Sequence, residues 1–282
     1  MTESHSEMEQ PIAPPQLLEL LESICGDLYQ EIKKKILDGS ASVQSMSAQI
    51  ADGQAIERLQ KLNKTSNIMV TGRKNADFNY VGLPQELENC SFREGFDHHL
   101  RKRLGKREDG FSTIFNHLDL KNFPLIVETG CLRVPGNWSG DGQSTFQFDW
   151  YARENQGHMI TIDVNKYSID SARRACSNVT SIILNDSVAA LHMLASNISR
   201  PASLLYLDSY DLCAADPMPS AIHHAMELIA SSKLMGPGTI ICVDDFDVPG
   251  VGRGGKGAII DEFFHNIRAN VIYSGYQKIW ML

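Results

Sequence analysis

From Phe123 onward, short and fully apolar runs alternate with helical stretches, and this alternation constrains the fold more than any other feature of the chain. Strands that are apolar on both faces are typical of a parallel sheet covered by helices on both sides. The strand candidates are Leu125–Val127, Met159–Ile162, Ser181–Leu184, Ser203–Leu207 and Thr239–Val243. The helical stretches lie near Ser144–Asn155, Ser168–Ser177, Ser187–Ala195 and Pro219–Ser232. The sequence therefore predicts a doubly wound, Rossmann-like α/β domain.

The end of the chain predicts a different kind of pairing. A helix near Ala258–Asn266 is followed by two strand candidates, Val271–Ser274 and Lys278–Leu282, on either side of Gly275. Two strands joined by so short a connection pair antiparallel. We therefore expect a seven-stranded sheet that ends in an antiparallel hairpin at its edge.

The first 120 residues have another pattern. Residues 1–15 are polar and predict a disordered tail, with no basic start or apolar run of a signal peptide. Apolar residues recur at steps of three and four over Gln16–Leu37, and less clearly over Val43–Leu62, which predicts amphipathic helices. We expect a mainly helical segment over 16–120, acting as a lid or in oligomerisation, and a catalytic domain over 121–282. A homo-oligomer is compatible with these helices.

Composition narrows the functional classes. A net charge of −8 argues against nucleic acid as the main partner, because binding of phosphate backbones needs a basic face. No apolar run is long enough to span a membrane. The six cysteines are scattered without a CxxC pair, which favours free thiols in a reducing compartment. The sequence predicts a cytoplasmic protein without a membrane or nucleic-acid partner.

One local cluster runs against the overall acidity. Residues 85–107 carry a basic cluster of Arg101, Lys102, Arg103, Lys106 and Arg107, with His98 and His99 beside it. Such a cluster indicates either a solvated helix face or a surface that attracts an anionic substrate. The sequence leaves both interpretations open.

The first strand ends in Glu128-Thr129-Gly130, and a loop then leads to Ser144 and Thr145. A glycine at the carboxyl end of a strand lets the backbone approach a ligand closely. Ser144 or Thr145 is a candidate N-cap of the following helix. The segment contains neither GxGxxG nor GxxxxGK[ST], so it predicts no dinucleotide fingerprint and no Walker-type phosphate loop.

The second and third strands end in acidic residues. Asp163 follows Ile160-Thr161-Ile162, where a carboxylate can accept hydrogen bonds from both ribose hydroxyls of a nucleoside. Asp186 and Ser187 follow the third strand. Asp186 is a candidate acceptor for an adenine amino group, and Ser187 is a candidate helix cap instead. These positions predict that the chain binds a nucleoside cofactor, but they do not indicate which reaction it catalyses.

Three more acidic residues follow the fourth and fifth strands. Adjacent parallel strands bring Asp208 close to Asp244 and Asp245, where three carboxylates repel one another unless they are protonated or bridged by a cation. Oxygen ligands in that number suit Mg²⁺, Mn²⁺ or Ca²⁺. The alternative is an acidic rim that holds no metal.

Taken together, the segments ETG…GDGQST, TIDVN, LNDS, LDSYD, GPGTIICVDDF and GAIIDEFF resemble a known family. They look like class I S-adenosylmethionine-dependent O-methyltransferases, in particular the metal-dependent sugar O-methyltransferases related to macrocin O-methyltransferase and to cephalosporin hydroxylase-like proteins. The resemblance covers about residues 123–282. It implies methyl transfer to a hydroxyl of a sugar or other small natural product, and a doubly wound sheet that ends in a hairpin.

The resemblance also implies roles for the strand-end residues. Those implied for the cofactor are Glu128, Thr129, Gly130, Ser144, Thr145, Asp163, Asp186, Ser187 and Asp208. Asp208, Asp244 and Asp245 would hold the divalent ion. This chain departs from the pattern in its long first loop, with Arg133, Pro135 and Trp138, and in Asp245, where catechol-type enzymes commonly have an amide ligand.

An O-methyltransferase also needs a base for the acceptor hydroxyl. The candidates are His223, His224 and Lys256, which follow the fourth and fifth strands. Asp208 is a further candidate for a catalytic role. The glycine-rich segment 246–257 is a candidate lid, with Arg253 or Lys256 meeting an anionic substrate. Two alternatives remain: a metal-independent methyltransferase or one acting on nitrogen or a macromolecule, and a Rossmann-like hydroxylase or oxidoreductase.

Overall fold

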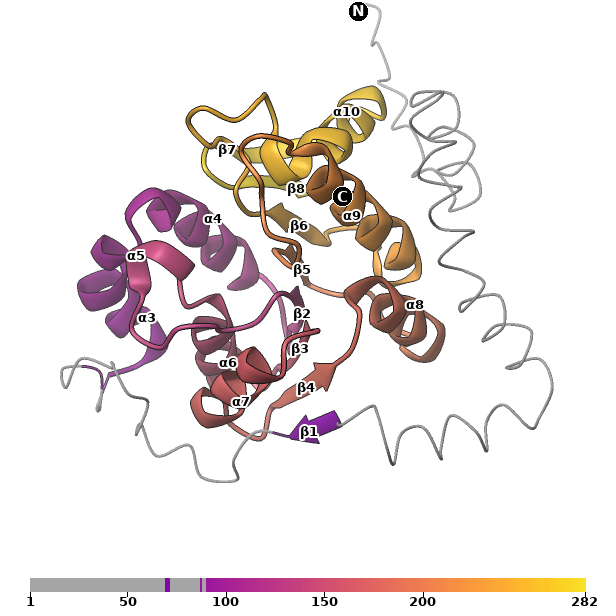
Figure 1. Cartoon of the computed structure of the whole chain (residues 1–282). Helices are drawn as coiled ribbons and strands as arrows, with labels where there is room; N and C mark the ends of the chain where they lie inside the picture. Colours follow the sequence, from indigo (N-terminus) through magenta and orange to yellow (C-terminus); the bar gives the residue numbers. More distant parts are fainter. Residues whose placement is uncertain (1–68, 72–86, 88–89) are drawn as a thin grey trace, which may run out of the picture.

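The computed structural model describes residues 69–71, 87 and 90–282, so the predicted tail 1–15 and the predicted helices Gln16–Leu37 and Val43–Leu62 lie outside the described residues. An eight-stranded sheet forms the centre, in the order β1-β4-β3-β2-β5-β6-β8-β7 (Figure 1). Its strands are β1 Met69–Thr71, β2 Leu125–Thr129, β3 His158–Asp163, β4 Thr180–Leu184, β5 Leu204–Leu207, β6 Ile240–Val243, β7 Asn270–Ser274 and β8 Lys278–Met281.

The five central strands are parallel, as their apolar sequences predict. Val127 of β2 lies between Ile160 of β3 and Leu205 of β5. The chain runs outward from β2 through β3 to β4 and then returns to β5 on the other side of β2. Their carboxyl ends therefore flank a topological switch point, the place where open α/β sheets bind ligands.

Both edges of the sheet carry antiparallel strands. β8 pairs with β6 and with β7, which confirms the predicted C-terminal hairpin. At the other edge β1 pairs with β4, with Met69 opposite Ile183, and this strand is absent from the seven predicted ones. Three residues are too few to show a strand period in a sequence, so only the pairing reveals β1.

The helices cover both faces of the sheet (Figure 1). They are α3 Phe92–Gly95, α4 Glu108–Leu118, α5 Trp138–Asp141, α6 Ser144–Glu154, α7 Lys166–Ala175, α8 Ser187–Asn197, α9 Met218–Ala230 and α10 Ala258–Asn266. α8, α9 and α10 pack on the face that carries Val127 and Leu205. α4 and α6 pack on the opposite face, against Ile126 and Tyr206. Neighbouring residues of one strand thus point to opposite layers.

Residues 92–118, which the sequence assigns to the helical accessory segment, form part of this second layer. Phe111 and Phe115 of α4 are fully buried in one apolar cluster with Ile126 of β2 and Ile240 of β6. A π-helical turn, Phe96–Leu100, and two 3₁₀ turns lead from α3 into α4. Within the described residues no helix is long and apolar enough to cross a membrane, and no disulfide is formed.

Candidate active site

A cleft opens at the carboxyl ends of the parallel strands. Gly130 after β2, Asp163 at the end of β3, Asp208 after β5 and Asp245 after β6 all line it. Arg107, which precedes α4, lines it as well. The sheet topology therefore brings together residues from five separate parts of the chain at the switch point.

Gly130 lets β2 and β5 approach each other at the base of the cleft. Its φ of +78° lies in the left-handed region, and a Cβ there would come within 2.3 Å of the backbone oxygen of Asp208. The Gly130 amide donates to the carbonyl of Ile162 at 2.9 Å. The neighbouring Thr129 carbonyl accepts from the Asp208 amide at 3.0 Å, which holds the end of β5 in place. A side chain at position 130 would disturb both strands.

Asp163 is held at the rim by two backbone amides. Its Oδ2 accepts from the Cys131 amide at 3.0 Å, and its Oδ1 accepts from the Asn165 amide at 2.7 Å. Each carboxylate oxygen has a second lone pair for a ligand hydroxyl. Asp163 is therefore oriented by the ends of β2 and β3 and can accept further hydrogen bonds from the cleft.

Glu128 lies one layer below the cleft and does not line it. The side chain is fully buried, and Oε2 accepts from the hydroxyls of Thr145 at 2.7 Å and Thr161 at 2.6 Å. Burial raises the pKa of Glu128 to about 7, although the hydroxyl donors oppose this. Its Oε1 has no hydrogen-bond partner in the structure. Glu128 acts on the cleft through Thr145, whose Oγ1 also accepts from the Leu132 amide at 2.9 Å.

The prediction that Ser144 or Thr145 caps α6 is wrong. Gln143 takes the N-cap position with a φ of +54°, and no side chain caps the helix there. The Thr145 hydroxyl donates to Glu128 instead, and Ser144 lines the cleft. The Gln143 side chain instead holds the long first loop, by accepting from the Gly136 amide and donating to the Val134 carbonyl.

The structure also reverses the assignment of the next helix cap. Asp186 is the N-cap of α8 and accepts from the Ala189 amide at 2.9 Å, so Ser187 is not the cap. The Ser187 hydroxyl lies 2.9 Å from Nε2 of His223. Neither Asp186 nor Ser187 lines the cleft. The contact of Asp186 with the adenine and the cofactor-binding role of Ser187 stay predictions.

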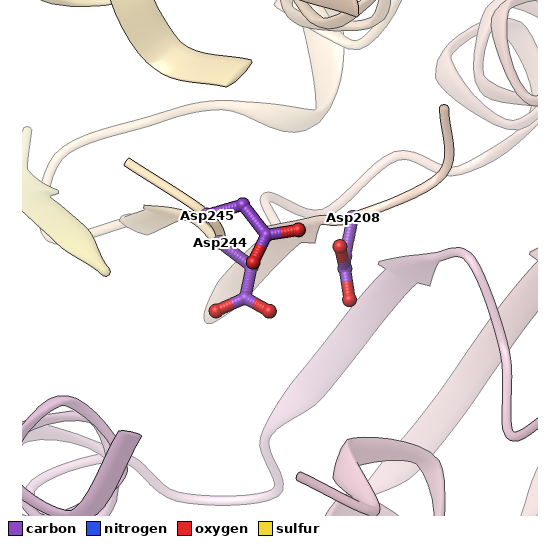
Figure 2. A group of neighbouring side chains, drawn as sticks. All are labelled: Asp208, Asp244 and Asp245. Atoms are coloured by element: carbon purple, nitrogen blue, oxygen red, sulfur yellow. The ribbon is translucent and has the colours of Figure 1, made fainter. Parts of the chain in front are cut away.

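The three acidic residues at the ends of β5 and β6 do come together (Figure 2). One carboxylate oxygen from each of Asp208, Asp244 and Asp245 lies within 4.8 Å of the others. Asp244 is fully buried at the end of β6, and Asp245 follows it with a φ of +49°. This uncommon backbone conformation turns the two adjacent carboxylates toward the same space.

Arg107 neutralises the deepest of these carboxylates. Its Nε donates to both oxygens of Asp244, at 3.0 and 2.7 Å, and Nη2 lies 2.7 Å from Oδ2. Nη1 donates to the carbonyl of Gly140 at 2.8 Å, and the guanidinium lies over the ring of Tyr276. The carboxylate of Asp244 raises the pKa of Arg107 even though burial acts in the opposite direction.

Lys256 forms ion pairs with the other two carboxylates. It lies in the 3₁₀ turn Gly255–Gly257, and its side chain is 1 % exposed. The ammonium contacts Oδ1 of Asp208 and lies 3.1 Å from Oδ2 of Asp245. The hydroxyl of Tyr276 also donates to Asp245. All three carboxylates are thus paired with side chains of this chain.

The charges of the cluster follow from these pairs. Burial alone would lower the pKa of Lys256, but Asp208 and Asp245 raise it, so the amine stays charged. Burial alone would raise the pKa of Asp245, but Lys256, the Tyr276 hydroxyl and Arg107 together lower it. Burial raises the pKa of Asp208, and the other two carboxylates add to this effect.

The predicted base candidates occupy different positions. Asp208 lines the cleft, whereas His223, His224 and Lys256 do not. His224 is fully buried, Nδ1 lies 2.7 Å from the carbonyl oxygen of Ser220, and burial lowers its pKa to about 4. Lys256 is charged and paired, so it cannot accept a proton or meet an anionic substrate in this arrangement. Asp208 is the candidate with access to an acceptor.

Several site residues carry no signal in the sequence. Arg107 stands within the basic cluster, yet it turns inward while Arg101 pairs with Glu108 at 3.0 Å on the surface. Glu227 of α9 is fully buried and accepts from the hydroxyl of Ser209, which lines the cleft. Tyr276 comes from the hairpin between β7 and β8. Only packing brings these residues into contact with the residues of the site, since no local spacing relates them.

More acidic than basic side chains line the cleft. Its charged lining residues are Arg107, Arg133, Asp141, Asp163, Asp208 and Asp245, four acids against two arginines. Arg133 crosses between the loops after β2 and β5, since it pairs with Asp211 at 2.6 Å and lies 3.6 Å from Asp141. A cationic ligand is favoured in such a cleft over a pyrophosphate.

The expected divalent ion does not fit these contacts. Three carboxylates in reach of one another are a suitable donor set for Mg²⁺ or Ca²⁺. Arg107 engages both oxygens of Asp244, however, and the Lys256 ammonium lies where an ion bridging Asp208 and Asp245 would lie. The sequence-derived metal site stays a prediction, and these contacts speak against it.

No protein-family model matches the sequence, and no curated protein matches it. The chain does show similarity to solved structures at low identity.

Three of these structures illustrate the similarity. CalS11, a calicheamicin methyltransferase, is 13% identical with a TM-score of 0.46, over 80% of this chain and 90% of that chain. The O-methyltransferase from Bacillus cereus in complex with S-adenosylhomocysteine is 17% identical with a TM-score of 0.42, over 67% of this chain and 96% of its own. MycE, a methyltransferase of mycinamycin biosynthesis solved with Mg and S-adenosylhomocysteine, is 12% identical with a TM-score of 0.43, over 62% of this chain.

The chain spans about half of MycE, since the match covers 48% of that structure. All three are named as methyltransferases, the class that the sequence resemblance predicts. At these TM-scores the similarity does not assign a function, so the functional argument rests on the cleft itself.

Proposed function

We propose that this protein is an S-adenosylmethionine-dependent O-methyltransferase that acts on a hydroxyl of a sugar or another small natural product. The observation that carries the proposal is the cleft at the switch point, which Asp163 and Asp208 both line. A carboxylate at the end of the second strand is suited to ribose hydroxyls. The acidic lining suits a sulfonium, which carries a positive charge at the transferred methyl group.

The cofactor fits the residues present. Gly130 leaves the backbone bare where a ligand would lie against β2, because any Cβ there is excluded by Asp208. Arg133 offers a guanidinium for a carboxylate, and Asp141 offers an acceptor for an amine, as an amino-acid group requires. Bound S-adenosylmethionine would supply an electrophilic methyl group. The chain would supply orientation and a proton acceptor.

Asp208 is the residue that we assign to the acceptor hydroxyl. It lines the cleft beside Gly130, and its raised pKa brings a carboxylate closer to the range in which it can take a proton at neutral pH. Lys256 touches Asp208 from the buried side and orients it. Proton transfer to Asp208 needs no divalent ion, and we include none in the proposal.

The test is calorimetric titration with S-adenosylmethionine, S-adenosylhomocysteine and NAD, followed by a screen of hydroxylated acceptors for S-adenosylhomocysteine formation. We expect micromolar binding of both sulfur nucleosides and no detectable binding of NAD, because the cleft offers acids where a pyrophosphate needs donors. Binding of NAD alone would support the oxidoreductase alternative. Failure of all three to bind would overturn the proposal.

A further inference from the structure

We infer that Lys256 and Arg107 are built-in cations that take the place of a divalent metal ion between Asp208, Asp244 and Asp245. The inference concerns cation binding alone, so it can fail or hold independently of the proposed methyl transfer. It departs from the metal site that the sequence resemblance implies. It rests on contacts and burial.

The Lys256 ammonium occupies the space that the ion would need. It contacts a carboxylate oxygen of Asp208 and lies 3.1 Å from an oxygen of Asp245. An ion that bridged these two carboxylates would stand between the same oxygens. Two cations cannot share that space, so a metal binds there only if the amine leaves.

The backbone keeps the amine close to the carboxylates. The Lys256 amide donates to the carbonyl of Asp245 at 3.2 Å. A Cβ on Gly255 would come within 2.0 Å of the same carbonyl oxygen, so the turn lies directly on Asp245. The side chain is 1 % exposed, and withdrawal would leave a charged amine in buried surroundings. Lys256 is therefore anchored at both ends.

Arg107 removes the third ligand. Both oxygens of Asp244 already accept from its guanidinium, and the carboxylate is fully buried. Capture of Asp244 by a metal would leave Arg107 without its principal partner in a site where 6 % of its side chain is exposed. The two pairings account for all three carboxylates.

The consequence is a division of roles within the cluster. Asp208 and Asp245 line the cleft, whereas Lys256 lies behind them and does not. An acceptor therefore meets carboxylates whose position and charge are set by Lys256, which makes Lys256 a positioning residue. The oxygen of the acceptor contacts no metal.

The experiment is titration of the full chain with Mn²⁺, followed by electron paramagnetic resonance, for the wild type, Lys256→Met and Lys256→Arg. We expect wild type and Lys256→Arg to bind Mn²⁺ no tighter than about millimolar, because their carboxylates are already paired. Lys256→Met leaves Asp208 and Asp245 without a counter-charge, and we expect it to bind at least about tenfold tighter. A folded Lys256→Met variant that gains no affinity would overturn the inference.

A second measurement covers the case in which Lys256→Met does not fold. The wild type is melted in EDTA and in Mg²⁺, since a bound ion stabilises the folded state and its removal lowers Tm. We expect the same Tm in both. A lower Tm in EDTA, or micromolar Mn²⁺ binding by the wild type that Asp208→Asn abolishes, would show a resident metal and overturn the inference. Titration with S-adenosylhomocysteine in EDTA tests the cofactor site separately.

Discussion

The two halves of the candidate site are built in different ways. The proposed cofactor half has Gly130 and Asp163 in the cleft and Asp186 outside its lining, and it is held by hydrogen bonds to backbone amides close in the sequence or on the neighbouring strand. The proposed acceptor half consists of Asp208, Asp244 and Asp245 with Arg107 and Lys256, and it is held by buried ion pairs. Arg107 and Asp244 are 137 residues apart.

This difference predicts how each half responds to substitution. A carboxylate held by backbone amides can be removed at a modest cost to the fold, because the amides can turn to water or a ligand at the rim. A carboxylate held by a buried cation cannot lose its partner without leaving an uncompensated charge. Stability should therefore depend most on the acceptor half, and cofactor affinity on the cofactor half.

The largest effect is expected in the acceptor half, for Arg107→Met. The substitution leaves the fully buried Asp244 without its partner, which costs about 3–5 kcal/mol of unfolding free energy. Urea denaturation at pH 7 measures the change. Arg101→Met is the matched control, since it removes an exposed pair with Glu108 and should cost less than about 1 kcal/mol. Equal effects of the two variants would contradict the assignment of Arg107.

The next largest effect is the pH dependence of the unfolding free energy that Glu128, which is buried next to the cofactor half, contributes. Its pKa is about 7 in the folded protein against an ordinary value of 4.5, so the folded state holds the proton more tightly. The favourable contribution is complete below pH 4.5 and is lost as the pH rises to 7, a change of about 3 kcal/mol. Glu128→Gln should abolish this loss, as urea denaturation from pH 4 to 8 can show.

Glu227→Gln provides the opposite case when the same urea denaturation series is extended down to pH 2. Its partner His223 and its neighbour His224 lower the pKa of Glu227 to about 2, although burial alone would raise it. The contribution of this carboxylate is present above pH 4.5 and is lost as the pH falls toward 2. The two variants should change the pH profile at opposite ends. Changes at the same end would show that the charge states are assigned wrongly.

A smaller effect, on binding, should separate the halves directly. Asp163→Ala removes the carboxylate proposed for the ribose, and we expect S-adenosylhomocysteine affinity to fall about 10- to 100-fold, as for a charged hydrogen-bond partner. Asp208→Asn keeps the shape of the acceptor half and should change that affinity less than about threefold while abolishing turnover. Calorimetry and a product assay measure the two quantities. Loss of affinity in both variants would remove the distinction between the halves.

The smallest effect is expected at Asp186. As the N-cap of α8 it accepts from the Ala189 amide, and Asp186→Ala should cost about 1 kcal/mol of unfolding free energy. Asp186→Ser retains a capping oxygen and should restore most of the stability. If the adenine contact predicted from the sequence exists, both variants also weaken S-adenosylhomocysteine binding. A loss of stability alone would leave Asp186 with its capping role.

The sheet and the cofactor half could be predicted from the sequence because they depend on local patterns. Fully apolar runs predicted the parallel strands, and Gly130 and Asp163 stand where those strands end. The hairpin around Gly275 was predicted as well, whereas the order of the strands in the sheet is given by the structure. β1 was missed because a strand of three residues is too short to show an alternating pattern, and only its pairing with β4 reveals it.

The sequence by itself also determined that Asp208, Asp244 and Asp245 would meet, because adjacent parallel strands end at one edge of a sheet. Only the tertiary structure decided what neutralises them. Arg107 looks like its basic neighbours in the sequence, and Lys256 looks like part of a glycine-rich lid. Their attraction to the buried carboxylates is strong because water is excluded from the cluster. That exclusion depends on the packing of α4 and of the turn before α10 around the cluster and not on spacing along the chain.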